Sequence, residues 1–393
     1  MKNNRTFLEK LLDGAEVEWK KLCEVSEIEK GKQLNKALLT ETGEYPVING
    51  GINPSGYWHE YNNEANAIVI SQGGASAGYV NWMTTPFFAG AHAYVVKTNE
   101  TLVQKRYAYH FLKMNQVKFM QNQYGAGIPA LAKSDLANLL IPIPPPSVQT
   151  EIVKILDALT ALTSELTSEL TLRRKQYEYY REKLLSEEEL GKVGFEWKTL
   201  EELVEKTQNI KWKNNTKTYR YIDLTSVDRE NNSITGTIEI NALNAPSRAQ
   251  KIVKENDIIF ATTRPTQQRV ALISKEFSDD IASTGYCVLR ANTKIVLPKW
   301  LFYFLSTINF KNYVEENQSG SAYPAISDSK VKEFRIPVPE ITIQQSIIGK
   351  LDKFYSLTNS LLHGLPKEIN NRKKQYSYYQ KELLNFLGDN IYE

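Results

Sequence analysis

The sequence IPIPPPSVQTEIVKILDALTAL, residues 141–162, determines how the rest of this chain is organised. A closely similar sequence, IPVPEITIQQSIIGKLDKFYSL, occupies residues 336–357. Both pass from a tetrapeptide with proline at alternate positions into a helical pattern that carries Leu-Asp at the same place. Because proline ends a strand and is tolerated in the first turn of a helix, each copy predicts a strand that leads directly into a helix.

The similarity extends along the whole chain. The matching pairs are residues 125–144 with 320–339, RRKQYEYYREKLL (173–185) with RKKQYSYYQKELL (372–384), AIVISQGGASAGYV (67–80) with DIIFATTRPTQQRV (257–270), and VEWKKLCEV (17–25) with FEWKTLEEL (195–203). Self-similarity of this kind indicates one structural unit, of roughly two hundred residues, that occurs twice.

The apolar residues after each proline tetrapeptide follow the spacing of a coiled-coil seam. The first seam is Val148, Ile152, Ile155, Leu159, Leu162 and Leu166, and the second is Ile343, Ile347, Phe354, Leu357 and Leu361. The first helix is predicted from about 148 to 186, with Ser147 as its N-cap. A helix this long needs a partner, so we expect the two helices to pack antiparallel instead of lying apart as independent surface helices. Gly364 and Pro366 should interrupt the second one.

The segments before the two long helices contain short strands, polar glycine-rich turns and one aromatic helix each, at 106–120 and 299–314. This pattern predicts an α+β fold with two pseudo-symmetric domains separated by two long antiparallel coiled-coil helices. The boundaries are 1–146 for the first domain with an N-terminal helix end, 147–190 for the first long helix, 191–340 for the second domain and 341–393 for the second long helix. Residues 7–12 should pack near residues 376–387, because the N-terminal helix end repeats the end of the first long helix.

Composition places the chain among globular proteins, with 41% hydrophobic and 24% charged residues and a net charge of only +3. No apolar run is long enough to span a membrane, and the N-terminus does not resemble a signal peptide, so we expect a cytoplasmic protein without a membrane partner. Two cysteines, Cys23 and Cys287, exclude a disulfide framework and a cysteine-based zinc cluster, and each is expected to be a buried thiol.

Motifs for catalysis are missing from the sequence. The glycine-rich stretch at 73–78 is followed by Tyr79 instead of the lysine of a phosphate-binding loop, and the four histidines are scattered without a second metal ligand nearby. We therefore predict a binding protein with no catalytic residue, no metal site and no cofactor of its own.

Two loops at matching positions differ completely in side-chain chemistry. Because Arg favours guanine and Gln favours adenine, we predict that the loops are DNA-binding sites that read different bases. The predicted residues are Gln72, Gly73, Gly74 and Ser76 in the first loop and Arg264, Thr266, Gln267, Gln268 and Arg269 in the second. Residues 37–96 contain no Lys or Arg, so phosphate contacts of the first domain would come from Lys97 and from Lys30, Lys32, Lys36, Lys105 and Arg106. The alternative is that both loops are ordinary surface turns.

The complete layout resembles the specificity (S) subunit of type I restriction–modification systems, most clearly at residues 141–144, 173–185, 336–339 and 372–384. The resemblance implies two target-recognition domains, each of which reads one half of a bipartite site in double-stranded DNA. It also implies that the long helices set the spacing and dock two methyltransferase (M) subunits, which restriction (R) subunits join. S-adenosylmethionine for adenine methylation, and ATP and Mg for cleavage, would be bound by those partners. The docking residues would be Arg173, Arg174, Gln176, Tyr177 and Tyr180 in the first copy, and Arg372, Lys373, Gln375, Tyr376 and Tyr379 in the second.

Two other interpretations stay open from the sequence. One is a coiled-coil adaptor that does not bind DNA and whose two domains bind peptide or polysaccharide. The other keeps DNA binding but assigns the chain to a methyltransferase-only or single-polypeptide restriction system.

Overall fold

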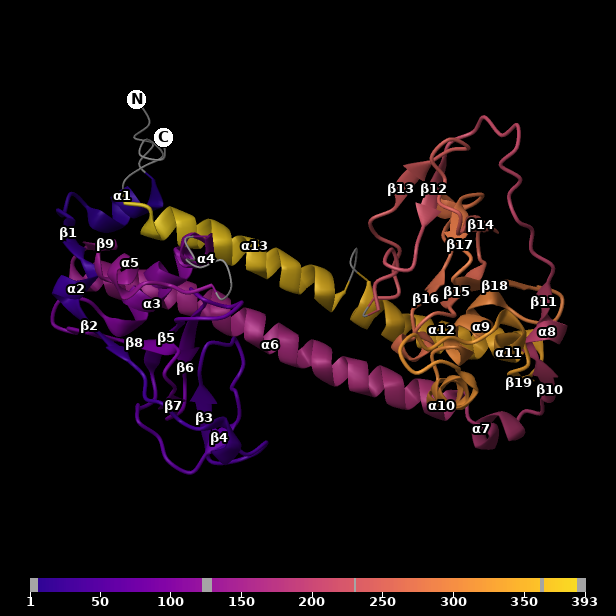
Figure 1. Ribbon diagram of the computed structural model, residues 1–393, viewed down its shortest axis with the longest axis horizontal. Helices are drawn as coiled ribbons and strands as arrows, with labels where there is room; N and C mark the ends of the chain where they lie inside the picture. The colour runs from indigo at the N-terminus through magenta and orange to yellow at the C-terminus, as the bar shows by residue number, and fades with distance from the viewer. Residues whose placement is uncertain (1–5, 122–128, 230, 361–363, 387–393) are drawn as a thin grey trace. The chain divides into compact units, whose positions relative to one another are not determined.

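The structure is a computed structural model that describes residues 6–121, 129–229, 231–360 and 364–386. The chain forms two compact units (Figure 1). Unit 1 contains residues 1–164 and 371–393, and unit 2 contains residues 165–370. Each unit therefore includes a portion of both long helices.

Unit 1 is built on a four-stranded antiparallel sheet in the order β2-β8-β5-β6 and a three-stranded sheet in the order β4-β3-β7. These strands are β2 (Ser26–Lys30), β3 (Tyr45–Ile48), β4 (Tyr57–Trp58), β5 (Ala67–Ser71), β6 (Val80–Met83), β7 (Phe88–Ala89) and β8 (Ala93–Thr98). A separate antiparallel pair joins β1 (Glu18–Lys21) to β9 (Leu140–Ile143). The helices are α1 (Phe7–Leu12), α2 (Leu22–Val25), α3 (Lys105–Met114), α4 (Gln116–Gln121), α5 (Lys133–Ala137) and portions of α6 (Pro146–Leu184) and α13 (Leu365–Leu384).

Unit 2 has sheets in the orders β11-β18-β15-β16 and β13-β12-β17-β14, which repeat the arrangement of unit 1 with β14 as an additional strand. The strands are β11 (Val204–Glu205), β12 (Tyr219–Ile222), β13 (Ile238–Ile240), β14 (Ala249–Ile252), β15 (Ile258–Ala261), β16 (Val270–Leu272), β17 (Ile281–Ser283) and β18 (Tyr286–Ala291). The pair β10 (Glu196–Thr199) and β19 (Arg335–Val338) matches β1 and β9. The helices are α7 (Glu187–Gly191), α8 (Leu200–Leu203), α9 (Pro298–Phe304), α10 (Ile308–Asn317), α11 (Asp328–Lys332) and α12 (Ile341–Asn359).

The matching sheet orders confirm the predicted α+β fold and its internal repeat. In both units the second sheet includes one parallel pair, β3 with β7 and β12 with β17. The aromatic helices differ from the prediction, because each is divided in two. Asn115 caps α3 before α4 begins, and Thr307 starts α10 as its N-cap with its side chain accepting from the Phe310 N–H.

The first long helix begins at Pro146, two residues before the predicted start. Ser147 therefore lies in the first turn, and its prediction as the N-cap was wrong. Proline occupies this first position because its missing N–H would have no partner there. The burial pattern also shifts, since Leu156 is completely buried whereas the predicted seam residue Ile155 is only partly buried.

The second long helix is interrupted, as predicted. Helix α12 ends at Asn359, and α13 begins at Leu365 with Pro366 in its first turn. Gly364 has a φ of +79°, a conformation that side chains with a Cβ rarely adopt. Of the predicted seam residues near the break, Leu357 is 37% exposed and does not belong to a seam, and Leu361 lies outside the described residues.

Helix packing is antiparallel within unit 2. The ring of Tyr177 on α6 lies 6.0 Å from that of Tyr355 on α12, and Tyr180 stacks on Phe354 at 5.2 Å. The two helices therefore run in opposite directions, because the later residue on α6 meets the earlier residue on α12. In unit 1, Leu8 of α1 shares a core cluster with Leu383 and Leu384 of α13, which confirms the predicted packing of residues 7–12 near the end of the last helix. No helix in the described part of the chain is long and apolar enough to cross a membrane.

A buried glutamine joins each long helix to the α+β domain that precedes it. Gln149 accepts a hydrogen bond from the Gln104 N–H at 2.8 Å and donates to the carbonyls of Leu102 and Pro144, both at 2.9 Å. Gln344 makes the same three bonds in unit 2, with Leu297 N–H and the carbonyls of Ile295 and Pro339. Each glutamine therefore pairs with backbone groups just before α3 or α9 and with a proline carbonyl just before its own long helix.

The prolines of the repeated tetrapeptides also contribute acceptors. The Pro142 carbonyl accepts from the Tyr107 hydroxyl at 3.0 Å, and the Pro337 carbonyl accepts from the Trp300 Nε1–H at 3.1 Å. Tyr107 and Trp300 are completely buried and occupy matching positions on α3 and α9. The bond is the same in both units although the donor side chains differ.

The repeated aspartate forms a third connection between helix and domain. Asp157 accepts from Arg106 Nε and contacts His110 Nε2, both at 2.7 Å. In unit 2 the equivalent Asp352 pairs with Lys299 at 2.7 Å and accepts from the Tyr303 hydroxyl at 2.5 Å. The Leu-Asp of the repeated sequence is therefore explained by two side chains, one turn apart on α3 or α9, that converge on one carboxylate.

The two carboxylate clusters differ in how they titrate. Burial lowers the pKa of His110 below its ordinary value of 6.5, although the hydrogen bond to Asp157 opposes this shift. Burial raises the pKa of Asp157, but the hydrogen bonds from His110 and Arg106 outweigh it and the net pKa is lowered from 3.8. Tyr303, the counterpart of His110, has a raised pKa because of burial, so it stays neutral near physiological pH.

Replacing Gln149 or Gln344, the buried glutamines that join helix and domain, should strongly destabilise the protein. In Gln344→Ala, the buried Pro339 carbonyl and the partly buried Leu297 N–H and Ile295 carbonyl lose their partner, and we expect the free energy of unfolding to fall by about 3 kcal/mol in urea titrations. Gln345 is the exposed neighbour on the same helix turn, and Gln345→Ala should change it by less than about 0.5 kcal/mol. Equal effects of the two substitutions would contradict the role of Gln344.

Unit 1 should lose stability at mildly acidic pH. Since the pKa of His110 is lower in the folded than in the unfolded chain, the unfolded chain binds more protons just below pH 6.5, and stability falls as the pH decreases through this range. Hydrogen exchange, corrected for intrinsic rates, should show faster opening of residues 105–114 at about pH 5.5 than at about pH 7.5, with no such change in residues 298–304. His110→Gln should remove the difference, and an equal response of both units would contradict it.

Candidate nucleic-acid interface

The two predicted reading loops are held by the same backbone hydrogen bonds. In unit 1 the loop follows β5, and the three bonds are Gln72 N–H to His92 O at 2.8 Å, Leu131 N–H to Gln72 O at 2.7 Å and Gly74 N–H to Pro129 O at 2.9 Å. In unit 2 the loop follows β15, and the bonds are Thr262 N–H to Gly285 O at 2.8 Å, Ile326 N–H to Thr262 O at 2.9 Å and Arg264 N–H to Pro324 O at 2.7 Å. The two loops therefore share one backbone frame.

The unit 1 loop depends on glycine at two positions. Gly74 and Gly78 have φ values of +87° and +88°. A Cβ on Gly78 would lie 2.8 Å from the backbone carbon of Phe119, which is too close for any side chain. With Gln72 and Ser76 as its polar side chains, this loop presents small groups and backbone to a partner.

A lysine that sequence reasoning missed lies behind this loop. The Lys113 ammonium donates to the Val80 carbonyl and to Gln116 Oε1, both at 2.7 Å, and lies 4.1 Å from the centre of the Tyr79 ring. Burial lowers the pKa of Lys113 to about 8. Its contacts are to the segment between the loop and β6, so Lys113 supports the loop from the α3 side.

The unit 2 loop has the same length as the unit 1 loop but carries larger and charged side chains. Arg264 is exposed with a φ of +49°, and its guanidinium lies 5.9 Å from the ring of Tyr323, which is 74% exposed. Tyr323 was not among the predicted residues. Thr266 and Gln267 belong to the short 3₁₀ turn Pro265–Gln267 that follows Arg264. The exposed Arg and Tyr side chains form a surface at the tip of the loop.

Arg269 has a supporting role in this loop. Its Nη1 donates to the Val227 carbonyl at 2.6 Å, and its Nε donates to Gln267 Oε1 at 3.3 Å. Gln268, between them, has a φ of +48°, which is unfavourable for a residue with a side chain. The tether formed by Arg269 holds the loop in this strained conformation.

The structure separates Lys97 from the unit 1 loop. Ser71, which precedes the loop, pairs with Ala93 at one end of β8, whereas Lys97 is near the other end, beside Ile68 and Val96. Lys97 also forms an ion pair with Glu29 at 2.5 Å. Arg106, another predicted phosphate contact, is used by the carboxylate of Asp157.

Several predicted docking residues are engaged within the fold. Tyr177 is 5% exposed, and Tyr376 contacts His110 Nδ1 through its hydroxyl at 3.0 Å. Tyr180 stacks on Phe354, and Tyr379 packs against the unit 1 core. Arg173 and Arg372 donate to Gln176 and Gln375, each at 2.8 Å. Among these predicted residues, Lys373 is exposed.

The exposed members of the repeated motif are residues that sequence reasoning passed over. Tyr179 and Tyr378 are each 60% exposed and stand at equivalent positions of RRKQYEYY and RKKQYSYY. Each lies edge-on to the following tyrosine with ring centres 5.4 Å apart. Lys175 and Lys374, one turn earlier, are exposed as well. These four residues define a repeated patch, Lys175–Tyr179 in unit 2 and Lys374–Tyr378 in unit 1.

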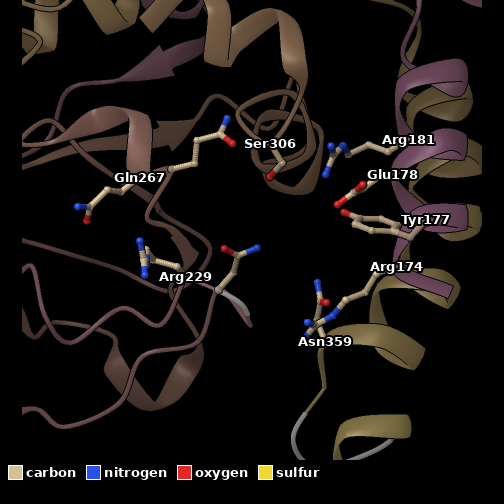
Figure 2. Close-up of a pocket in the computed structure, with 10 residues that line it drawn as sticks. Arg174, Tyr177, Glu178, Arg181, Arg229, Gln267, Ser306 and Asn359 are labelled. Atoms are coloured by element: carbon tan, nitrogen blue, oxygen red, sulfur yellow. The ribbon is translucent and has the colours of Figure 1, made fainter. Parts of the chain in front are cut away.

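A polar pocket of about 320 Å³ lies between α6 and the recognition domain of unit 2 (Figure 2). The lining residues are Arg174, Tyr177, Glu178 and Arg181 from α6, and Arg229, Asn232, Gln267, Gln268, Ser306 and Asn359 from the other segments. The pocket therefore brings two residues of the reading loop together with residues that were predicted to dock a protein partner.

The two cysteines differ in their exposure. Cys287 is buried as predicted, and burial raises the pKa of its thiol to about 12. Cys23 is exposed, so its prediction as a buried thiol was wrong. Within the described ranges, His, Cys, Asp and Glu side chains form no group of three that could hold a metal ion.

Comparisons with known proteins agree with this architecture. The family described as type I restriction modification DNA specificity domain matches residues 15–172 and, a second time, residues 192–371. A Haemophilus influenzae protein named for a type I restriction enzyme specificity subunit is 37% identical over 98% of this chain and 100% of its own length. The EcoR124I/EcoR124II specificity subunit of Escherichia coli is 32% identical, with 97% of each chain covered.

A solved structure shows the same fold. The S subunit of a type I restriction–modification system from M. genitalium aligns with a TM-score of 0.63 over 98% of both chains, at 19% identity. The two family matches coincide with the two copies of the internal repeat, and the relatives extend over almost the whole sequence. The chain therefore belongs to the family of type I restriction–modification DNA specificity proteins.

Proposed function

We propose that this chain is the non-catalytic specificity subunit of a type I restriction–modification complex, in which each recognition domain reads one half of a bipartite site in double-stranded DNA. The observation that carries this proposal is the shared backbone frame of the two reading loops, which present unlike side chains. Equal frames place both loops in the same way against a duplex. Unlike side chains then select different bases in the two halves.

The reading chemistry differs between the halves. In unit 2, Arg264 is exposed near the ring of Tyr323, and its guanidinium can donate two hydrogen bonds to guanine. In unit 1, the Oε1 of Gln72 is buried, and Ser76 and glycine backbone offer close approach without a positive charge. The family match favours DNA over peptide or polysaccharide as the ligand.

The same proposal includes two copies of one protein partner. The repeated patch places the same exposed Lys and Tyr in both units, so two identical surfaces are available to two identical subunits. Methyltransferase subunits are the partners that such a complex requires, and restriction subunits would join them. S-adenosylmethionine, ATP and Mg belong to those subunits in this proposal, and not to this chain.

Exchange of one recognition domain should change only half of the target. If residues 198–340 are replaced by the corresponding domain of another specificity subunit, the complex should methylate adenine in a site with one half unchanged and one half new. Mapping methylated adenines across a host genome measures this outcome. A change in both halves would contradict independent reading by the two domains.

Loss of one exposed tyrosine should remove one partner subunit. Truncation of a hot-spot tyrosine weakens association by about 2 kcal/mol or more, so with Tyr179 as such a residue Tyr179→Ala should leave complexes with one methyltransferase subunit in native mass spectrometry. Tyr378→Ala should give the same stoichiometry, and the double variant should bind neither copy.

A matched control is available on the same helix. Leu172 is 61% exposed, but its counterpart in the second copy is Asn371, so it is not part of the repeated patch. Leu172→Ala should retain both partner subunits. Loss of both subunits in Tyr179→Ala alone, or of neither in the double variant, would contradict the assignment of the patch.

A further inference from the structure

The pocket of unit 2 has a cationic wall on α6. Glu178 and Arg181 extend from the helix toward the segment that carries Ser306, and Arg174 extends toward Asn359 (Figure 2). Arg229 lines the opposite side. Among the residues that the structure describes, three guanidinium groups and one carboxylate line this pocket, and no acidic residue lines its recognition-domain side. Such a lining attracts an anion.

The lining is also rich in hydrogen-bond donors. Asn232, Gln267, Gln268 and Asn359 contribute carboxamides, and Ser306 contributes a hydroxyl. Arg181 pairs with Glu182 at 2.9 Å and lies over the ring of Tyr177, but a guanidinium has five N–H donors and this pair uses only some of them. An anion with several oxygen atoms could accept from both walls at once.

One donor in the lining lacks an acceptor. The Nε2 of Gln268 is buried and has no hydrogen-bond partner within the residues that the structure describes. The left-handed backbone of Gln268 and the tether of Arg269 to Val227 hold this side chain where it is. A buried amide without an acceptor is unfavourable, and an oxygen of a bound ligand would relieve it.

We infer that this pocket binds a backbone phosphate of DNA next to the half-site read by unit 2, an assignment that rests on the proposed function. Gln267 and Gln268 belong to the loop that exposes Arg264 toward bases, so a duplex held by that loop brings phosphates to the pocket. The geometry gives α6 a direct role in DNA binding through Arg174 and Arg181. Phosphate contacts of this kind position the duplex and do not select sequence.

Arg229→Gln is the variant that tests the site, because Arg229 is exposed and its loss leaves the contacts of α6 in place. Lys294→Gln is the matched control, since Lys294 is an exposed cation that follows β18, whereas the reading loop lies near Tyr286 at the start of that strand. Binding of the chain in complex with its methyltransferase subunits is measured at several salt concentrations on a duplex with the target and on one of equal length without it.

The expected result is a weaker affinity of Arg229→Gln for both duplexes by the same factor, and a salt-dependence slope smaller by about 1. The ratio of wild-type to variant affinity should then shrink by about threefold between 50 and 200 mM salt. Lys294→Gln should behave like the wild type. If Arg229→Gln also matches the wild type, or if it alters the methylated sequence, the phosphate assignment is wrong.

Two further outcomes separate the alternatives. Labelled ATP serves as the probe for a free nucleotide phosphate, and its binding to the wild type with loss in Arg229→Gln, at unchanged DNA affinity, would replace DNA by nucleotide as the ligand. If the wild-type complex binds neither duplex, the proposed function itself fails. If the wild type binds its target and Arg229→Gln is unaffected, only the pocket assignment fails.

Discussion

The connection between each long helix and its recognition domain is the constraint on which the rest of the molecule depends. Three groups of the repeated sequence form hydrogen bonds to α3 or its N-terminus in unit 1 and to α9 or its N-terminus in unit 2. They are a proline carbonyl, a glutamine side chain and an aspartate side chain. A recognition domain attached through these contacts has a defined orientation on its own portion of helix. The reading loop inherits that orientation because α3 and α9 pack on the central sheets.

In the proline and aspartate connections, the acceptor is the same in both units and the donor side chains differ. Tyr107 and Trp300 serve the same proline carbonyl position, and His110 and Tyr303 serve the same carboxylate position. In the loops the backbone bonds are retained and the side chains differ. The geometry of the connections and loops is thus maintained by backbone groups and by a few side chains that are the same in both copies. Other positions differ between the copies in size and charge.

Repetition in the sequence predicted the fold well, because two copies of one pattern support each other. Local sequence patterns were sufficient to predict three features. These are the strand that leads into each long helix, the interruption at Gly364 and the packing of α1 near the end of α13. Leu156 was missed because helical spacing alone does not show which of two adjacent apolar residues faces the core. The division of each aromatic helix depends on capping at Asn115 and Thr307, which periodicity cannot reveal.

The candidate sites were less predictable, because function depends on which side chains remain exposed after packing. Tyr177 and Tyr179 belong to the same motif, yet one is buried and the other is exposed, and the motif alone does not distinguish them. Lys97 was predicted from its charge as a phosphate contact, and strand pairing places it near the end of β8 away from the loop, beside Glu29. Tyr323 could not be assigned because its role depends on a loop that is remote in sequence from Arg264.

The small strand pairs at the domain entrances have an evolutionary consequence. Glu18 pairs with Ile143 and Glu196 pairs with Val338, so each recognition domain enters and leaves through two hydrogen-bonded neighbours. A genetic crossover within these strands transfers a closed cassette whose two ends already meet. The helix beyond keeps its own glutamine and aspartate, so new target sequences can arise by recombination without redesign of the scaffold that carries them.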